Sequence, residues 1–193
     1  MNIQHKIFER KENFEITSKF DVIFINYLNL ILIFFPIFLL TGPFLPDLAI
    51  VICSISFSYL CIKYKLYRYF DFLILKVLAL FWIFIVFSSL MSDNIFFSLR
   101  SSFLYLRFLI FSVFVLYIIK NYSNFLRYFF YALTITLIIV LFDSYYQFFF
   151  ETSLSGFDKP KLRLTGPFGD RQIVGSFIAR ILPLYLFLTY YLY

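Results

Sequence analysis

The chain has 193 residues, of which 62% are hydrophobic and only 15% are charged. A typical soluble domain has roughly half apolar and a quarter charged residues, so a soluble fold has too little interior to bury this many apolar side chains. The net charge of +6 does not indicate a nucleic-acid partner, because the basic residues are spread between apolar segments and do not cluster on one face. The composition excludes a soluble enzyme and a nucleic-acid-binding protein.

Apolar segments long enough to cross a ~30 Å hydrocarbon core follow one another along the chain. A polar, cytoplasmic tail at residues 1–20 precedes them. We expect spans at residues 21–40, 46–62, 71–91, 99–119, 125–150 and 170–193, with an outward loop at 151–170. The predicted fold is therefore all-α, a polytopic integral membrane helical bundle of about six transmembrane helices in residues 21–193.

The distribution of Lys and Arg predicts the orientation, because these residues accumulate in short cytoplasmic loops. The tail and the loops after the second and fourth spans carry nine of them: Lys6, Arg10, Lys11, Lys19, Lys63, Lys65, Arg68, Lys120 and Arg127. The loops after the first and third spans carry only Arg100. We expect a cytoplasmic N-terminus and an outward 151–170 loop, although this last loop is itself basic.

That basic loop region also holds most of the glycine in the chain. Of the five glycines, four lie between positions 156 and 175, namely Gly156, Gly166, Gly169 and Gly175. Glycine permits a positive φ angle or the close approach of another group, so the cluster predicts a shaped, ligand-facing segment. Gly166, Gly169 and Gly175 are its expected loop-shaping residues. The alternative is a plain connecting loop whose cations touch lipid headgroups.

Asp170 is expected to cap the sixth helix, which leaves the first-turn amides of that helix beside Arg171. Lys161 and Arg163 lie a few residues earlier in the sequence, within reach of that helix terminus. Helix N-termini attract anions, and a guanidinium group matches phosphate oxygens in a two-pronged fork. The four residues Lys161, Arg163, Asp170 and Arg171 therefore predict a phosphate or diphosphate site that needs no metal.

Three charged residues lie deep inside predicted spans, where charge is costly and indicates function by default. Arg107, Asp143 and Arg180 reach similar depths below the expected outer surface, which predicts an intramembrane polar pocket. Tyr146 and Gln147 stand three and four positions after Asp143 and share its helix face. The alternative is that Asp143 only neutralises one arginine in a packing pair.

Neither a metal site nor a cofactor is expected. The one histidine, His5, lies in the charged tail, so the chain offers no histidine cluster for a metal. Cys53 and Cys61 lie eight residues apart on one predicted helix, about 12 Å, which is too far for a disulfide.

The stretch from Asp143 to Pro183, with DSYYQFFFETSLSGFD and RLTGPFGDRQIVGSFIARILP, resembles the bacterial O-antigen ligase and O-antigen polymerase family of membrane glycosyltransferases. YLRFLIF around Arg107 is similar to a span of the same family. The resemblance implies transfer of a glycan from an undecaprenyl-diphosphate carrier to a lipid or glycan acceptor in lipopolysaccharide O-antigen biosynthesis. It places the site on the periplasmic side of the bacterial inner membrane, among membrane lipids. Arg163 and Arg171 would hold the diphosphate, although many relatives have an acidic residue in place of Arg171.

Family members carry a second half with a large outward loop that holds catalytic residues. We expect this chain to correspond to the N-terminal half, with its catalytic residues unknown and with a second polypeptide as the partner that supplies the other half. Two alternatives stay open: a transporter or flippase of lipid-linked sugars, and a non-catalytic membrane subunit.

The orientation is testable by labelling with a membrane-impermeant thiol reagent. After removal of Cys53 and Cys61, a cysteine at Ser155 is expected to react in intact cells, because the 151–170 loop is predicted to lie outside. Labelling only after lysis would contradict this orientation.

Overall fold

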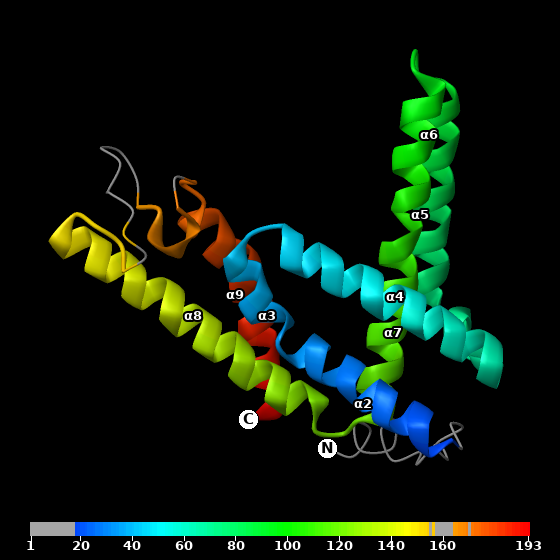
Figure 1. Ribbon diagram of the computed structural model, residues 1–193, viewed down its shortest axis with the longest axis horizontal. Coiled ribbons are helices and arrows are strands. Elements are labelled where there is room, and N and C mark those ends of the chain that lie inside the picture. The colour runs from blue at the N-terminus through cyan, green and yellow to red at the C-terminus, as the bar shows by residue number, and fades with distance from the viewer. Residues whose placement is uncertain (1–17, 155, 157–163, 170) are drawn as a thin grey trace. The chain divides into compact units, whose positions relative to one another are not determined.

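The computed structural model describes residues 18–154, 156, 164–169 and 171–193 (Figure 1). Within this part of the chain every regular element is a helix, which confirms the predicted all-α class. The α-helices are α2 (Lys19–Ile33), α3 (Phe35–Phe38), α4 (Phe44–Tyr64), α5 (Leu73–Leu90), α6 (Ile95–Leu104), α7 (Leu106–Asn121), α8 (Phe125–Phe150) and α9 (Val174–Leu192). Three 3-10 turns join them: η1 (Leu39–Thr41), η2 (Leu66–Asp71) and η3 (Gly166–Phe168).

Most of these helices are long and apolar enough to cross a membrane. The candidate spans are α4, α5, the continuous stretch Ile95–Asn121 formed by α6 and α7, α8 and α9. A further span results if Lys19–Ile33 and Phe35–Thr41, which meet at a 51° bend, cross together. Each candidate overlaps one of the predicted segments. The chain is a multi-pass helical membrane protein.

The chain divides into two compact units, the first made of Met1–Asn29 and Leu48–Ser123. Its core is aromatic and joins α4, α7 and η2. The Phe57 ring lies 5.4 Å from Phe114 and 5.5 Å from Tyr117, and Tyr69 meets Tyr117 edge-on at 5.0 Å. These four side chains are buried. Such tilted pairs contribute specific packing beyond area burial.

Serine and tryptophan hydrogen bonds join α5 to α6, which run side by side in Figure 1. The indole Nε1 of Trp82 donates to the carbonyl of Ser102 at 2.9 Å. The Ser89 and Ser102 hydroxyls are hydrogen-bonded to each other, and both residues are buried. Polar contacts of this kind fasten helix pairs in a membrane, where hydrophobic burial supplies little net force.

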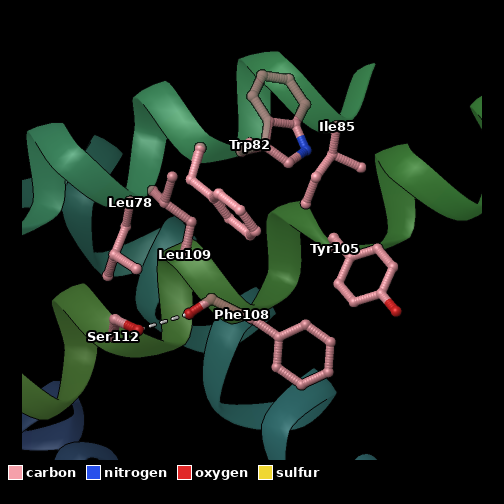
Figure 2. Close-up of a pocket in the computed structure, with 8 residues that line it drawn as sticks. Leu78, Trp82, Ile85, Tyr105, Phe108, Leu109 and Ser112 are labelled. Carbon is pink, nitrogen blue, oxygen red and sulfur yellow. Dashed lines mark hydrogen bonds between the residues drawn. The ribbon is translucent and has the colours of Figure 1, made fainter. Parts of the chain in front are cut away.

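An apolar cavity of about 320 Å³ lies where α5 faces the junction of α6 and α7 (Figure 2). Its lining comprises Leu78, Phe81, Trp82, Ile85, Tyr105, Phe108, Leu109 and Ser112. The Ser112 hydroxyl donates to the Phe108 carbonyl at 2.8 Å and is therefore engaged. Since this lining carries no charged side chain, the cavity suits a hydrocarbon chain better than a phosphate.

A buried carboxylate fixes α2 to the end of α4. Asp21 is only 2% exposed and accepts hydrogen bonds from the Lys63 ammonium group and from the Tyr64 hydroxyl. Because the charge has both a counter-ion and a second donor, its burial is compensated.

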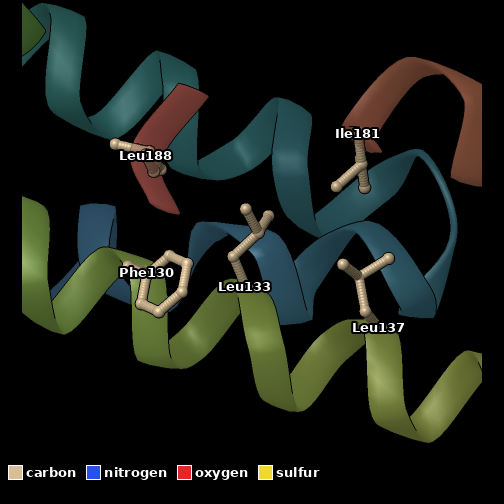
Figure 3. Packing of buried hydrophobic residues seen from close by; sticks show 5 residues of the cluster. All are labelled: Phe130, Leu133, Leu137, Ile181 and Leu188. Atoms are coloured by element: carbon tan, nitrogen blue, oxygen red, sulfur yellow. The ribbon is translucent and has the colours of Figure 1, made fainter. Parts of the chain in front are cut away.

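The second unit comprises Leu30–Asp47 and Asn124–Tyr193. Its core lies between α8 and α9, and Figure 3 shows Phe130, Leu133 and Leu137 of α8 close to Ile181 and Leu188 of α9. The α8 residues recur at the three-to-four residue spacing that places side chains on one helix face. The short helix α3 also packs on α8.

Truncation of this core is expected to destabilise the protein, whereas truncation of the exposed face is not. Leu133 is 2% exposed and Leu141, on the same helix, is 43% exposed. Leu133→Ala should lower the free energy of unfolding by about 2–5 kcal/mol, because it leaves a cavity. Thermal unfolding of the purified protein in detergent measures the effect, with Leu141→Ala as the matched control. Equal melting temperatures for the two variants would contradict this packing.

Candidate functional site

Three polar residues on one side of α8 form what we call the polar face of α8: Asp143, Ser144 and Gln147. All are buried, with exposures of 2%, 7% and 0%. Asp143 and Gln147 are four residues apart, so their side chains lie one turn apart on the same face, as predicted from the sequence. Both hold the polypeptide that follows α8.

The Gln147 side chain forms three hydrogen bonds with Thr165 and Gly166, at the start of η3. Its Oε1 accepts from the backbone N–H groups of Thr165 at 2.9 Å and Gly166 at 3.0 Å. Its Nε2 donates to the Thr165 hydroxyl at 2.8 Å. Gln147 and Thr165 are both 0% exposed, so these bonds form in a dry environment where unpaired groups are costly.

Asp143 holds the other flank of the same loop. Its Oδ1 accepts a hydrogen bond from the backbone N–H of Leu154 at 2.7 Å. In the part of the chain that the structure describes, its Oδ2 is buried without a hydrogen-bond partner. The polar face of α8 thus retains one acceptor that a hydroxyl or a cation would satisfy.

Gly166 is the point of closest approach between the loop and α8. Its φ is +53°, a backbone conformation that residues with a side chain rarely adopt. A Cβ at this position would lie 2.9 Å from Ser144 Oγ and 3.3 Å from Val174 Cγ2. The prediction of Gly166 as a loop-shaping residue has both a conformational and a steric basis.

Gly169 also has a positive φ, +65°, where η3 ends. The chain then packs η3 onto α9 through the rings of Phe168 and Phe177, whose centroids are 5.0 Å apart. Gly175 differs from the prediction: it lies in the first turn of α9 and is a helical, exposed residue. Its expected loop-shaping role is wrong, because the helix has already begun at Val174.

The start of α9 also corrects the expected capping role of Asp170. The N-cap position is occupied by Ile173, which makes no side-chain cap hydrogen bond. The carbonyls of the preceding residues are used in tight turns, since Phe168 N–H donates to Thr165, Arg171 N–H to Phe168 and Ile173 N–H to Arg171. Because of these turns, α9 begins at Val174, a few residues after the start expected at Asp170.

Of the four residues predicted to bind diphosphate, only Arg171 belongs to the described part of the chain. It is exposed and lies two residues before the N-cap of α9. Lys161, Arg163 and Asp170 lie outside the described residues, so the diphosphate site stays a prediction.

Two other predicted pocket residues do not join the polar face of α8. Tyr146 is half-buried and stacks on Phe150 of its own helix, with ring centroids 4.5 Å apart. Arg180 is exposed on α9, and among the described residues it forms no ion pair with Asp143. Within the second unit Arg180 does not face the interior as expected, because the buried stripe of α9 passes through Val174, Ile181 and Leu188.

Arg107 belongs to the first unit, near the start of α7. It lines a groove of about 270 Å³ together with Ser54 and Ser58 of α4 and apolar neighbours. Its guanidinium lies over the Phe108 ring at 5.0 Å, and its backbone carbonyl accepts a hydrogen bond from Ser54 Oγ at 2.9 Å. Arg107 therefore has a polar and aromatic setting inside its span, in keeping with a costly intramembrane charge.

Sequence reasoning missed three contributors: Ser144, the backbone N–H of Leu154, and Thr165. Ser144 lies beside Asp143 and donates to the carbonyl of Val140 at 2.7 Å. Thr165 directly precedes Gly166 in the motif, so its position next to a required glycine was an available signal. The contact of Leu154 could not be predicted from its residue type, because only its backbone N–H takes part.

Comparison with protein-family models, with curated proteins and with solved structures finds no match for this chain. The class that the fold defines is a multi-pass α-helical membrane protein with a buried polar face on one long helix. The site itself combines a glutamine that binds one loop flank and an aspartate that binds the other.

The role of Gln147 is testable by proteolysis. Gln147→Leu leaves the buried Thr165 and Gly166 amides without acceptors, at a cost of about 1–3 kcal/mol. Trypsin cleavage after Lys161 and Arg163 is expected to accelerate roughly tenfold as the flank opens more often. Gln172→Leu is the control, because Gln172 is exposed. The same cleavage rate in both variants would contradict the anchoring role.

Proposed function

We propose that this protein binds a polyprenyl-diphosphate-linked glycan and serves a glycan-transfer reaction of cell-surface polysaccharide synthesis, as the resemblance to the O-antigen ligase and polymerase family implies. The membrane in this proposal is the bacterial inner membrane, and the site faces the periplasm. The observation that carries the proposal is the double anchoring of the basic loop on the polar face of α8.

The two anchors lie close together. Four helical residues, about 6 Å of rise, separate Asp143 from Gln147. Leu154 is bound to the first and Thr165 to the second. The segment between these flanks has the sequence that includes Lys159, Lys161 and Arg163. Both flanks of this basic sequence are bound to α8, and this supports the proposal that its cations serve one binding site.

The start of α9 adds a second favourable feature. Its N-cap residue, Ile173, makes no side-chain cap hydrogen bond, and Arg171 is exposed nearby. A helix N-terminus carries partial positive charge and free N–H groups, so it favours an anion. Arg171 and the N-terminus of α9 thus favour binding of an anionic ligand at the C-terminal end of the loop.

Diphosphate is the leaving group in such a transfer. The acceptor hydroxyl oxygen forms a bond to the anomeric carbon and gives its proton to a general base. The bond from that carbon to the carrier diphosphate breaks, and the diphosphate leaves with the electron pair. Negative charge develops on the departing diphosphate, and cations placed beside it lower the barrier. In this proposal Lys161, Arg163 and Arg171 supply that charge, which requires neither a metal nor a nucleotide sugar.

Binding of the carrier tests the proposal. The full chain in lipid nanodiscs is expected to bind undecaprenyl diphosphate more tightly than undecaprenyl monophosphate. Arg163→Ala should weaken binding of the diphosphate about tenfold or more, because a charge-assisted hydrogen bond contributes roughly 1.5–3 kcal/mol. Microscale thermophoresis measures both affinities.

The matched control is Arg100→Ala, which removes an exposed arginine from α6 in the first unit. Its affinity for undecaprenyl diphosphate is expected to equal that of the unaltered chain. Equal loss in both variants would indicate general charge attraction, and equal affinity for the diphosphate and the monophosphate would refute the proposed ligand.

A further inference from the structure

Helix α9 has two different faces in the second unit. Val174, Ile181 and Leu188 are buried against the rest of the unit. The opposite face is exposed, and we call its first half the outer face of α9: Gly175, Ser176, Ala179, Arg180 and Pro183. These residues recur every three or four positions, so they form one stripe along the helix.

Arg180 makes this stripe unusual for a membrane span. It lies six residues after Val174, about 9 Å along the helix axis, within a helix apolar enough to cross a membrane. A charged side chain at such a position is costly in contact with hydrocarbon and normally pairs with another polar group. Asp143 is not that group, since the two form no ion pair among the described residues.

The backbone carbonyl of Ala179 also needs a polar partner. Pro183 has no N–H, so the carbonyl of Ala179 cannot receive its usual hydrogen bond from four residues on. Ala179 is exposed and adjacent to Arg180. Two neighbouring exposed residues thus carry a backbone acceptor without its usual donor and a cation, and the hydrocarbon of a membrane offers neither a donor nor an anion.

The side chains around Arg180 leave room for close approach. A Cβ added to Gly175 would have nothing within 4 Å. Gly175 and Ala179 have the four-residue spacing of small residues that lets helix backbones approach in membranes. The outer face of α9 therefore allows close packing of another helix, and its arginine favours an acidic group on that helix.

We propose that the outer face of α9 binds a transmembrane helix that presents a carboxylate to Arg180. Charge complementarity selects this occupant. A second copy of α9 packed two-fold on the same face would bring two Arg180 side chains together, which is repulsive. The narrow stripe of small residues fits a helix backbone, whereas a lipid headgroup has no need of it.

A model helix tests this binding with the whole chain. The probe is a synthetic leucine-alanine transmembrane peptide with one central Glu, compared with the same peptide carrying Leu there. The chain, labelled at Tyr193→Cys after Cys53→Ala and Cys61→Ala, is placed in phosphatidylcholine vesicles, and energy transfer to labelled peptide is measured. The Glu peptide is expected to bind about tenfold more tightly than the Leu peptide.

Variants assign the effect to this surface. Arg180→Gln should abolish the preference for Glu, and Arg180→Glu should transfer the preference to a peptide with Lys. Arg127→Gln, which removes an exposed arginine from α8 in the same unit, is expected to leave the preference unchanged. Ala179→Leu should weaken binding of the Glu peptide by blocking close approach.

Two outcomes would overturn the proposal. Equal binding of the Glu and Leu peptides would show that Arg180 selects no carboxylate. Loss of Glu-peptide binding when phosphatidylglycerol replaces part of the phosphatidylcholine would identify an anionic lipid headgroup as the occupant. Neither outcome bears on undecaprenyl diphosphate binding at Arg163, which is measured separately.

Discussion

The hydrogen bonds of the Gln147 side-chain amide hold the loop of the second unit in place. A buried amide group inside a membrane protein has to find partners within the protein, because hydrocarbon offers none. Gln147 finds them in the Thr165 and Gly166 amides and the Thr165 hydroxyl. This arrangement in turn requires glycine at position 166, because its φ is +53° and a side chain there would meet Ser144. One glutamine thus fixes the position of η3, and η3 then contacts α9 through Phe168 and Phe177.

Asp143 shows a different balance of burial and bonding. One oxygen is bound to the Leu154 amide, and the other is buried without a partner in the described part of the chain. Asp21 in the first unit is equally buried but has both a lysine and a tyrosine as donors. Asp21 is thus a structural carboxylate that is paired with a cation, whereas Asp143 keeps a buried acceptor at a candidate site.

The two arginines expected to share a pocket have different surroundings. Arg107 lines a groove with two serines and lies over an aromatic ring. Arg180 is exposed on the stripe of α9 that faces away from the core. Similar depth along two helices does not decide which way two side chains point, because each helix can rotate about its own axis. The core contacts of Ile181 and Leu188 set that rotation for α9.

The sequence by itself determined the helical class, the approximate positions of the spans, and the shared face of Asp143 and Gln147. These properties are local: apolar length and helical spacing do not depend on what packs against a segment. It also identified Gly166 and Gly169 as positions that need glycine. Tertiary structure alone decided that Gln147 binds Thr165, that Asp143 binds the Leu154 amide, that α9 begins at Val174, and that Arg180 lies outside the core. Each of these depends on backbone turns and packing between residues distant in the chain, and a pattern of residue types does not encode such geometry.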